Sequence, residues 1–247
     1  MLTSNQVRQV FNGKVVKECK RIPAKVQKDE LENRKDLRNL LTVTIDGDDA
    51  KDFDDAISIV KNEKGYLLYV HIADVSHYVK ENSALDQEAY LRGNSIYVCD
   101  RVVPMLPFDL SNGICSLNPN VDRLTITCAM QVDEKGNLLT YNVFPSVIHS
   151  DKRCTYKKVN ACLNGDEIML EEYSEVKDLL YTLESLAKLL KKQSHNRGCI
   201  DFNTKEAKIL MDKNGYPIDV RVLERGFAEQ MIEECMILAN VCVAHHM

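Results

Sequence analysis

The sequence of 247 residues predicts an α+β fold in which a mixed, antiparallel-rich sheet is packed by helices. Two observations lead to this prediction. Short runs of alternating, β-branched residues joined by turn sequences follow residue 40, and apolar residues at helical spacing mark the second half. No stretch reaches the roughly 18 apolar residues of a membrane-spanning helix, and the start lacks the apolar block of a secretory signal. A protein of the cytoplasm is therefore expected.

The first forty residues differ in character from the rest. They carry an excess of Lys and Arg and little apolar periodicity. We interpret 1–40 as a basic linker or the edge of a preceding domain, and 41–247 as the main domain.

Strand signals begin at Leu41. Turn sequences at 62–65 and 133–137 predict two hairpins, since each lies between alternating apolar runs. The runs that predict strands are 41–46, 56–60, 66–72, 124–132 and 138–144.

Two helices are predicted in the second half. Ser174 is expected to be the N-cap of the first, which carries an apolar stripe from Val176 to Leu190 and stops at 195–198. The second begins near Gly226, and its pattern still continues at Met247. We therefore expect the chain to be a fragment of a longer protein.

Composition excludes several classes of protein. The nine cysteines are odd in number and none forms a C-x-x-C pair, so free thiols are expected, with no disulfide partner and no zinc ribbon. The formal net charge of −5 argues against a protein that binds nucleic acid by bulk charge alone.

The most informative segment is an acidic cluster from Asp46 to Asp55, with six aspartates in ten positions. Its apolar flanks, such as Ile45 and Phe53, argue against a simple solvated loop, because they tie the carboxylates to core strands. Converging carboxylates need raised pKa values or a bound cation, and hard oxygen ligands favour Mg²⁺, Mn²⁺ or Ca²⁺. An EF-hand is excluded, because Lys51 stands where that loop requires glycine.

Two interpretations of the cluster remain. A Mg²⁺-type catalytic site is favoured over a structural cation site, since Mg²⁺ takes few carboxylates and completes its shell with substrate phosphate. The implied chemistry is metal-assisted attack of water on a phosphodiester.

Several ordered motifs resemble the catalytic (RNB) domain of the ribonuclease II superfamily, and its bacterial ribonuclease R branch most. They are TIDGDDAKDFDDA, VHIADVSHYV, RGNSIYV, PMLP, SNGICSLNPNVDRL and MIEECMILAN. The resemblance covers about 41–247, and 1–40 is similar to the connection from that family's cold-shock (OB) domains. It implies a processive 3′→5′ exoribonuclease that releases nucleoside 5′-monophosphates. Since the family's domain continues further and its cold-shock and S1 domains are missing here, this chain alone is expected to be weak or inactive.

The resemblance also implies roles for individual residues. Asp46, Asp52 and Asp55 would ligate Mg²⁺, with Mn²⁺ as a substitute, and Asp54 would help hold the metal ions and the attacking water in the chemical step. Asp48 and Asp49 lie outside this set and are interpreted as solvated residues that shape the loop.

Four further residues map to RNA contacts at the 3′ end of a single strand. Tyr97 and Phe202 would stack on bases, although strand aromatics are more often core side chains. Tyr156 and Glu233 would contact ribose hydroxyls, although the alternative for Glu233 is a helix-surface carboxylate.

His71 is predicted to be structural, and basic residues such as Arg92 and Arg153 are more often solvated than bound to phosphate. Two alternative functions remain: a non-catalytic RNA-binding relative, and a structural divalent-cation module.

Overall fold

The computed structural model describes residues 4–98, 101–200, 206–212, 214–223 and 225–247. The chain divides into two compact units. Unit 1 consists of Met1–Ala24, Val75–Ile114 and Phe202–Glu224, and unit 2 consists of Lys25–Asp74, Cys115–Asp201 and Arg225–Met247.

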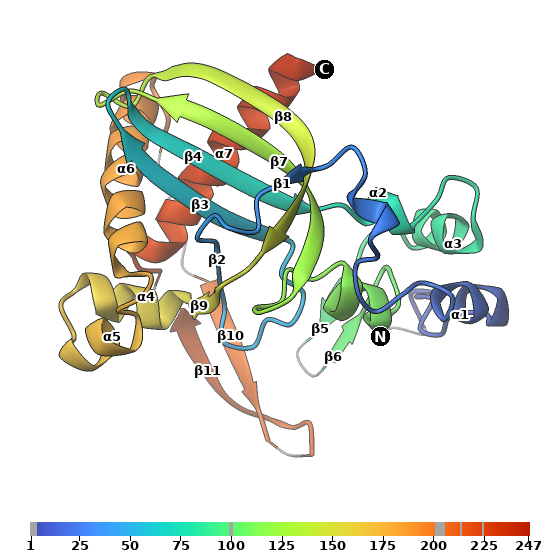
Figure 1. Cartoon of the computed structure of the whole chain (residues 1–247). Coiled ribbons are helices and arrows are strands. Elements are labelled where there is room, and N and C mark those ends of the chain that lie inside the picture. The colour runs from blue at the N-terminus through green and yellow to red at the C-terminus, as the bar shows by residue number, and fades with distance from the viewer. Residues whose placement is uncertain (1–3, 99–100, 201–205, 213, 224) are drawn as a thin grey trace. The chain divides into compact units, whose positions relative to one another are not determined.

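Unit 2 is built on a seven-stranded sheet with the order β1-β8-β7-β4-β3-β2-β9 (Figure 1). The β1–β8 and β2–β9 pairs are parallel and the remaining neighbours are antiparallel. The strands are β1 (Lys35–Asp36), β2 (Val43–Asp46), β3 (Asp55–Asn62), β4 (Gly65–Ala73), β7 (Asp122–Val132), β8 (Leu138–His149) and β9 (Lys152–Thr155). The expected antiparallel-rich, mixed sheet is confirmed.

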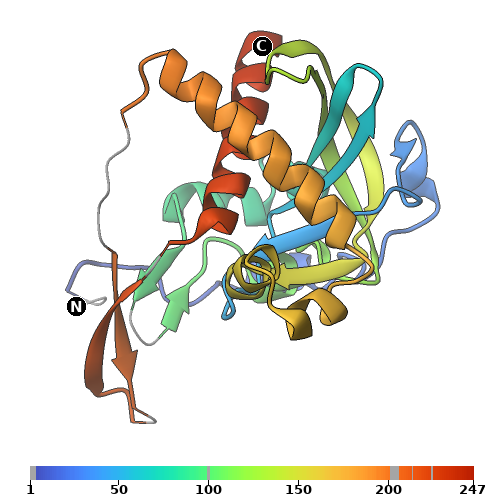
Figure 2. The same ribbon diagram turned by 90° about the vertical axis from the view of Figure 1, so that its left-hand side faces the viewer.

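Helices cover one face of this sheet. The two long ones, α6 (Lys177–Asn196) and α7 (Phe227–His246), lie on the same side of the strands (Figure 2), and the short helices α4 (Tyr156–Leu163) and α5 (Glu167–Glu172) follow β9. Alternate strand residues point toward α6 and α7, where they form the apolar core with the inner faces of both helices. Core residues include Ile57, Leu68, Met130, Leu183 and Cys235.

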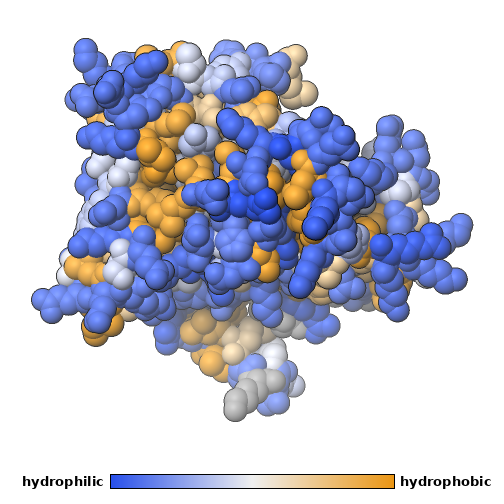
Figure 3. Space-filling view, in the orientation of Figure 1, coloured by the Kyte–Doolittle hydropathy of each residue, from blue (hydrophilic) through white to orange (hydrophobic). Residues whose placement is uncertain are grey.

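The opposite face of the sheet carries a different kind of interior. Ser58, His71, Thr127 and Ser146 are all fully buried there and hydrogen-bond to one another. Figure 3 shows hydrophilic side chains over much of the sheet face turned toward the viewer, with apolar ones between them.

Unit 1 is made of short elements. Its helices and turns are α1 (Gly13–Cys19), α2 (Val75–Tyr78), α3 (Ala84–Arg92) and a π-type turn (Leu110–Ile114). Its strands form two separate pairs, β5 (Ile96–Val98) with β6 (Arg101–Val103) and β10 (Glu206–Met211) with β11 (Pro217–Leu223).

The predicted hairpins and both predicted long helices are confirmed, with one correction. The first long helix begins at Lys177 with Val176 as its N-cap, so the prediction of Ser174 as N-cap is wrong. The reason is packing: Tyr173 and Val176 are both buried in the core, and the chain turns between them before the helix starts.

Two further expectations concern the whole described chain. All eight described cysteines are free thiols, and every one except Cys199 is buried. None of the helices in the described part of the chain is long and apolar enough to cross a bilayer. The proposed boundary at residue 40 stays a prediction; within 1–40, β1 pairs with β8 and α1 belongs to unit 1.

Candidate active site

The four aspartates singled out in the sequence lie at the junction of β2 and β3. Asp46 is the last residue of β2 and Asp55 the first of β3, while Asp52 and Asp54 lie in the connection between them. Because β2 and β3 are neighbouring antiparallel strands, the end of one and the start of the other meet at the same edge of the sheet. The fold thus brings Asp46 and Asp55 together.

A buried phenylalanine holds the connection in place. Phe53 is 3% exposed and lies between Asp52 and Asp54 in the sequence. Its N–H donates to Ser116 Oγ (2.9 Å), its carbonyl accepts from the N–H of Leu117 (2.9 Å), and Ser116 Oγ donates to the Lys51 carbonyl (3.1 Å). These bonds fix the backbone that carries the two aspartates.

Arg153 of β9 supports the other part of the same connection. Its Nη2 donates to the carbonyls of Asp48 (2.8 Å) and Ala50 (3.2 Å), and its guanidinium lies 5.1 Å from the centre of the Phe53 ring. The interpretation of Arg153 as a solvated cation is therefore wrong, since the residue orders the acidic segment and its charge reaches Asp46.

The carboxylates act on one another electrostatically. Burial and the neighbouring carboxylates of Asp55 and Asp54 raise the pKa of Asp46 to about 7, against the opposing charge of Arg153. Burial and Asp54 raise the pKa of Asp55 to about 6. Partial desolvation and Asp52 raise the pKa of Asp54. Such shifts follow when like charges share a poorly solvated place without a counterion.

One oxygen of this group has no partner. Asp46 Oδ2 is buried and accepts no hydrogen bond, which is costly for a carboxylate. An unpaired, buried oxygen among mutually repelling carboxylates suits a hard divalent cation such as Mg²⁺. As the side chains stand, however, no three His, Cys, Asp or Glu residues of the described chain converge closely enough to hold an ion. The donor chemistry therefore fits a cation, and a bound ion would require the aspartates to draw together.

Tyr156 lies beside these carboxylates. It begins α4 directly after Thr155, which is the register partner of Asp46 across the β2–β9 pair. Burial, Asp46 and Asp55 raise the pKa of Tyr156 to about 12, so its hydroxyl stays protonated and can donate a hydrogen bond. The fold therefore places Tyr156 near the aspartates, and its contact with a ribose hydroxyl stays a prediction.

The other residues predicted to contact RNA lie on exposed surfaces or outside the described residues. Glu233 is on the exposed surface of α7, where its carboxylate accepts from Arg225 Nη2 (2.8 Å). Tyr97 is on β5 of unit 1 with 66% of its surface exposed, so the interpretation of Tyr97 as a core side chain is wrong. Phe202 lies outside the described residues.

Ser116 and Arg153 were missed as parts of this site. Ser116 lies within SNGICSLNP, so that motif was a signal that the residue does more than fill a loop. Arg153 offered no comparable signal, because its role depends on pairing between strands that are about a hundred residues apart.

Comparisons with known proteins agree with this geometry. A family model described as "RNB domain" matches residues 34–247. Ribonuclease R of Thermotoga maritima is 53% identical over 95% of this chain and 33% of its own length. The chain thus spans about a third of that relative.

Solved structures give the same result. A structure of Mycoplasma genitalium RNase R in complex with ribose-methylated single-stranded RNA matches with a TM-score of 0.88 at 35% identity, covering 97% of this chain and 37% of that one. Yeast Ssd1, described as a pseudonuclease, shares the fold alone, with a TM-score of 0.64 at 17% identity over 85% of this chain and 25% of its own. The arrangement of strands, aspartates and sequence similarity together establish that the chain belongs to the RNB domain family.

Proposed function

We propose that this chain supplies part of the active site of a Mg²⁺-dependent 3′→5′ exoribonuclease that degrades single-stranded RNA processively to nucleoside 5′-monophosphates. One observation carries the proposal: four aspartates lie within ten residues at the β2–β3 junction, and a buried oxygen of Asp46 among them has no hydrogen-bond partner. The similarity to ribonuclease R supports the same reaction and substrate class. The described free thiols suit a reducing compartment, and we propose the cytoplasm.

The roles proposed for the residues are those that the family resemblance implies, and the position of the aspartates at the β2–β3 junction supports them. Asp46, Asp52 and Asp55 would hold Mg²⁺ or Mn²⁺, and Asp54 would orient the water that attacks the terminal phosphodiester. The metal, when bound, activates that water and neutralises charge on the phosphoryl oxygens. A bound cation would offset the repulsion that, together with burial, raises the pKa of Asp46, so the carboxylates that hold it would be ionised at neutral pH.

The remaining contacts would grip the RNA. The protonated Tyr156 hydroxyl can donate to a ribose hydroxyl, which DNA lacks at the 2′ position. The exposed ring of Tyr97 can stack on a base without reading its identity. Glu233, with Phe202, completes the proposed set.

A second candidate is a non-catalytic RNA-binding protein. It is favoured by the finding that no three ligand side chains of the described chain converge as they stand. The two candidates share RNA binding and differ in hydrolysis.

The test measures cleavage of a 3′-labelled single-stranded RNA by the full-length protein in the presence of Mg²⁺. Asp54→Asn is expected to lower the rate of label release by about 10²- to 10⁴-fold while RNA affinity stays within about twofold, because one positioned group in the chemical step contributes about that much. Asp48→Asn is the matched control, since Asp48 is an exposed aspartate of the same connection outside the proposed set.

Each alternative predicts a different result. Binding without label release in the unsubstituted protein would establish the non-catalytic candidate. Neither binding nor release would favour the structural cation module. Full activity in Asp54→Asn would remove Asp54 from the chemical step.

A further inference from the structure

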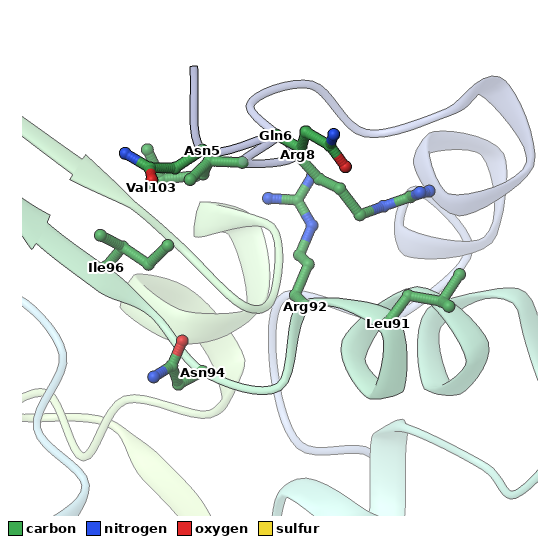
Figure 4. Close-up of a pocket in the computed structure, with 9 residues that line it drawn as sticks. Asn5, Gln6, Arg8, Leu91, Arg92, Asn94, Ile96 and Val103 are labelled. Atoms are coloured by element: carbon green, nitrogen blue, oxygen red, sulfur yellow. The ribbon is translucent and has the colours of Figure 1, made fainter. Parts of the chain in front are cut away.

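Unit 1 contains a polar pocket with a volume of about 220 Å³ (Figure 4). Its polar lining comes from Asn5, Gln6, Arg8, Arg92 and Asn94. Figure 4 shows the Arg92 guanidinium rising from the end of α3 toward the segment that carries Asn5 and Gln6. The pocket therefore has two cationic side chains and no acidic one among its described lining residues.

Arg92 lines the pocket although its side chain is only 4% exposed, which is unusual for an arginine. Its Nε donates to Glu88 Oε1 (3.0 Å), its Nη1 donates to the Pro104 carbonyl (3.0 Å), and its guanidinium lies 3.8 Å from the Phe11 ring centre. Its Nη2 is also buried but donates to no acceptor. A buried guanidinium nitrogen without an acceptor is costly, and an anion in the pocket would satisfy it.

The charge balance around Arg92 is positive. Glu88, with a side chain 2% exposed, accepts from Arg92 and also from Nε (2.9 Å) and Nη2 (2.7 Å) of Arg8. One carboxylate thus serves two guanidinium groups, which leaves one net positive charge. The Glu88 contacts also fix both arginines in place, so the pocket is organised before any ligand arrives.

We propose that this pocket binds a phosphate group of a single-stranded RNA. The inference rests on the proposed function only in taking RNA as the ligand. A phosphate offers the acceptor oxygens that Arg92 Nη2 lacks, and the amide groups of the lining can donate to the same oxygens. The lining residue Ile96 directly precedes the exposed Tyr97 on β5, so the pocket and the ring proposed to stack on a base belong to the same short strand, with the two side chains on opposite faces of it.

The main test variant is Asn94→Asp, which adds a carboxylate to the lining. Asn94 is exposed, so the fold is expected to survive the change. In an Asp54→Asn background, in which hydrolysis is expected to be slowed, RNA affinity is expected to fall about tenfold. The slope of log affinity against log salt concentration is expected to fall in magnitude by about 0.7, the value for one lost phosphate contact on a single strand. Gln87→Glu adds the same charge at an exposed position of α3 outside the lining, and affinity should change less than twofold.

A second variant and a second probe make the outcome decisive. Arg8→Gln removes a cation from the pocket and should lower both the affinity and the slope in the same way. Unchanged RNA affinity and slope in both variants would overturn the proposal. Equilibrium dialysis with labelled orthophosphate tests whether the pocket binds free phosphate instead of a phosphate group of RNA. If Asn94→Asp weakens orthophosphate binding but leaves RNA affinity unchanged, the assignment to RNA is wrong.

These results are independent of the cleavage assay. RNA binding that depends on the pocket, in a protein that does not hydrolyse RNA, would sustain this inference and refute the proposed hydrolysis.

Discussion

Two polar regions of the same sheet have opposite characters. The hydroxyl and imidazole network on the sheet face away from α6 and α7 is buried and internally satisfied: His71 Nδ1 lies 2.7 Å from Thr127 Oγ1, and His71 Nε2 lies 3.1 Å from Ser58 Oγ. The aspartate site at the β2–β3 junction holds several like charges and an oxygen without a partner. Polar groups that satisfy one another stabilise a fold, whereas groups left unsatisfied indicate a place for a ligand.

The pKa shifts express the same contrast. Burial lowers the pKa of His71 to about 3, so the imidazole is neutral and serves as a hydrogen-bonding group at any ordinary pH. In the aspartate site, burial and repulsion raise the pKa of Asp46 to about 7, so the site is destabilised by its own charge near neutrality. The prediction that His71 is structural agrees with this environment.

The largest expected effect on stability comes from breaking the network. His71→Leu would leave the hydroxyls of Ser58 and Thr127 without the ring nitrogens that they contact, and we expect the free energy of unfolding to fall by about 2–4 kcal/mol. Urea denaturation followed by circular dichroism measures this change. His245→Leu, at an exposed position near the end of α7, is the control and should change stability by less than about 0.5 kcal/mol. Equal stability of the two variants would show that the network contributes little.

A smaller effect of opposite sign is expected in the aspartate site. The pKa of Asp46 is about 7 in the folded chain and about 4 when unfolded, so the folded state binds more protons between these values and its stability falls as pH rises through that window. Asp46→Asn removes the charge. It should stabilise the metal-free chain by about 1 kcal/mol at pH 8, allowing for solvent screening, and by nearly nothing at pH 4.

The measurement is thermal unfolding of both proteins between pH 4 and pH 8. The lowered pKa of His71 makes stability decrease as pH falls below about 6.5, but this contribution is common to both proteins and cancels in their difference. Mg²⁺ should restore stability to the unsubstituted chain at pH 8 more than to Asp46→Asn. A difference that does not depend on pH would contradict the repulsion described for the site.

The parts of the fold that were predictable are those specified by neighbouring residues. The β3–β4 and β7–β8 hairpins have turn sequences between alternating strands, and α6 has its apolar stripe within one segment. The aspartates were found because they are close in sequence. By contrast, β9 becomes a strand by pairing in parallel with β2, from which it is separated by about a hundred residues, and local periodicity carries no sign of that partner.

The same reasoning explains what was missed in the site. The hydrogen bonds from Arg153 to the acidic connection, and from Ser116 to its backbone, join segments that are distant in sequence. Arg92 was interpreted as solvated although Glu88, four residues earlier, was a local signal for an ion pair. The contacts of its guanidinium with Phe11 and the Pro104 carbonyl join separate segments and leave no such signal. The metal and the roles of individual aspartates in the reaction stay predictions.

The smallest expected effects on stability come from two neighbouring threonines, one with a hydrogen-bonded hydroxyl and one without, which compare the two regions most directly. Thr42 and Thr44 are both fully buried and are two residues apart, on one face of the same extended segment. The Thr42 hydroxyl lies 2.7 Å from Ser58 Oγ and donates to the Leu40 carbonyl (2.8 Å), whereas the Thr44 hydroxyl has no partner. Valine has nearly the same shape as threonine, so one substitution at each position isolates the hydroxyl.

Thr42→Val is expected to lower the free energy of unfolding by about 1 kcal/mol, because it removes two hydrogen bonds and leaves Ser58 with one fewer partner. Thr44→Val is expected to be neutral or to raise that free energy by a few tenths, because it removes a buried hydroxyl that is not hydrogen-bonded. Urea denaturation of the two variants side by side measures both values. Equal destabilisation by Thr44→Val and Thr42→Val would contradict this comparison. It would mean that hydrogen bonding does not distinguish the network from the part of β2 that ends at Asp46, and that packing alone accounts for the stability of both.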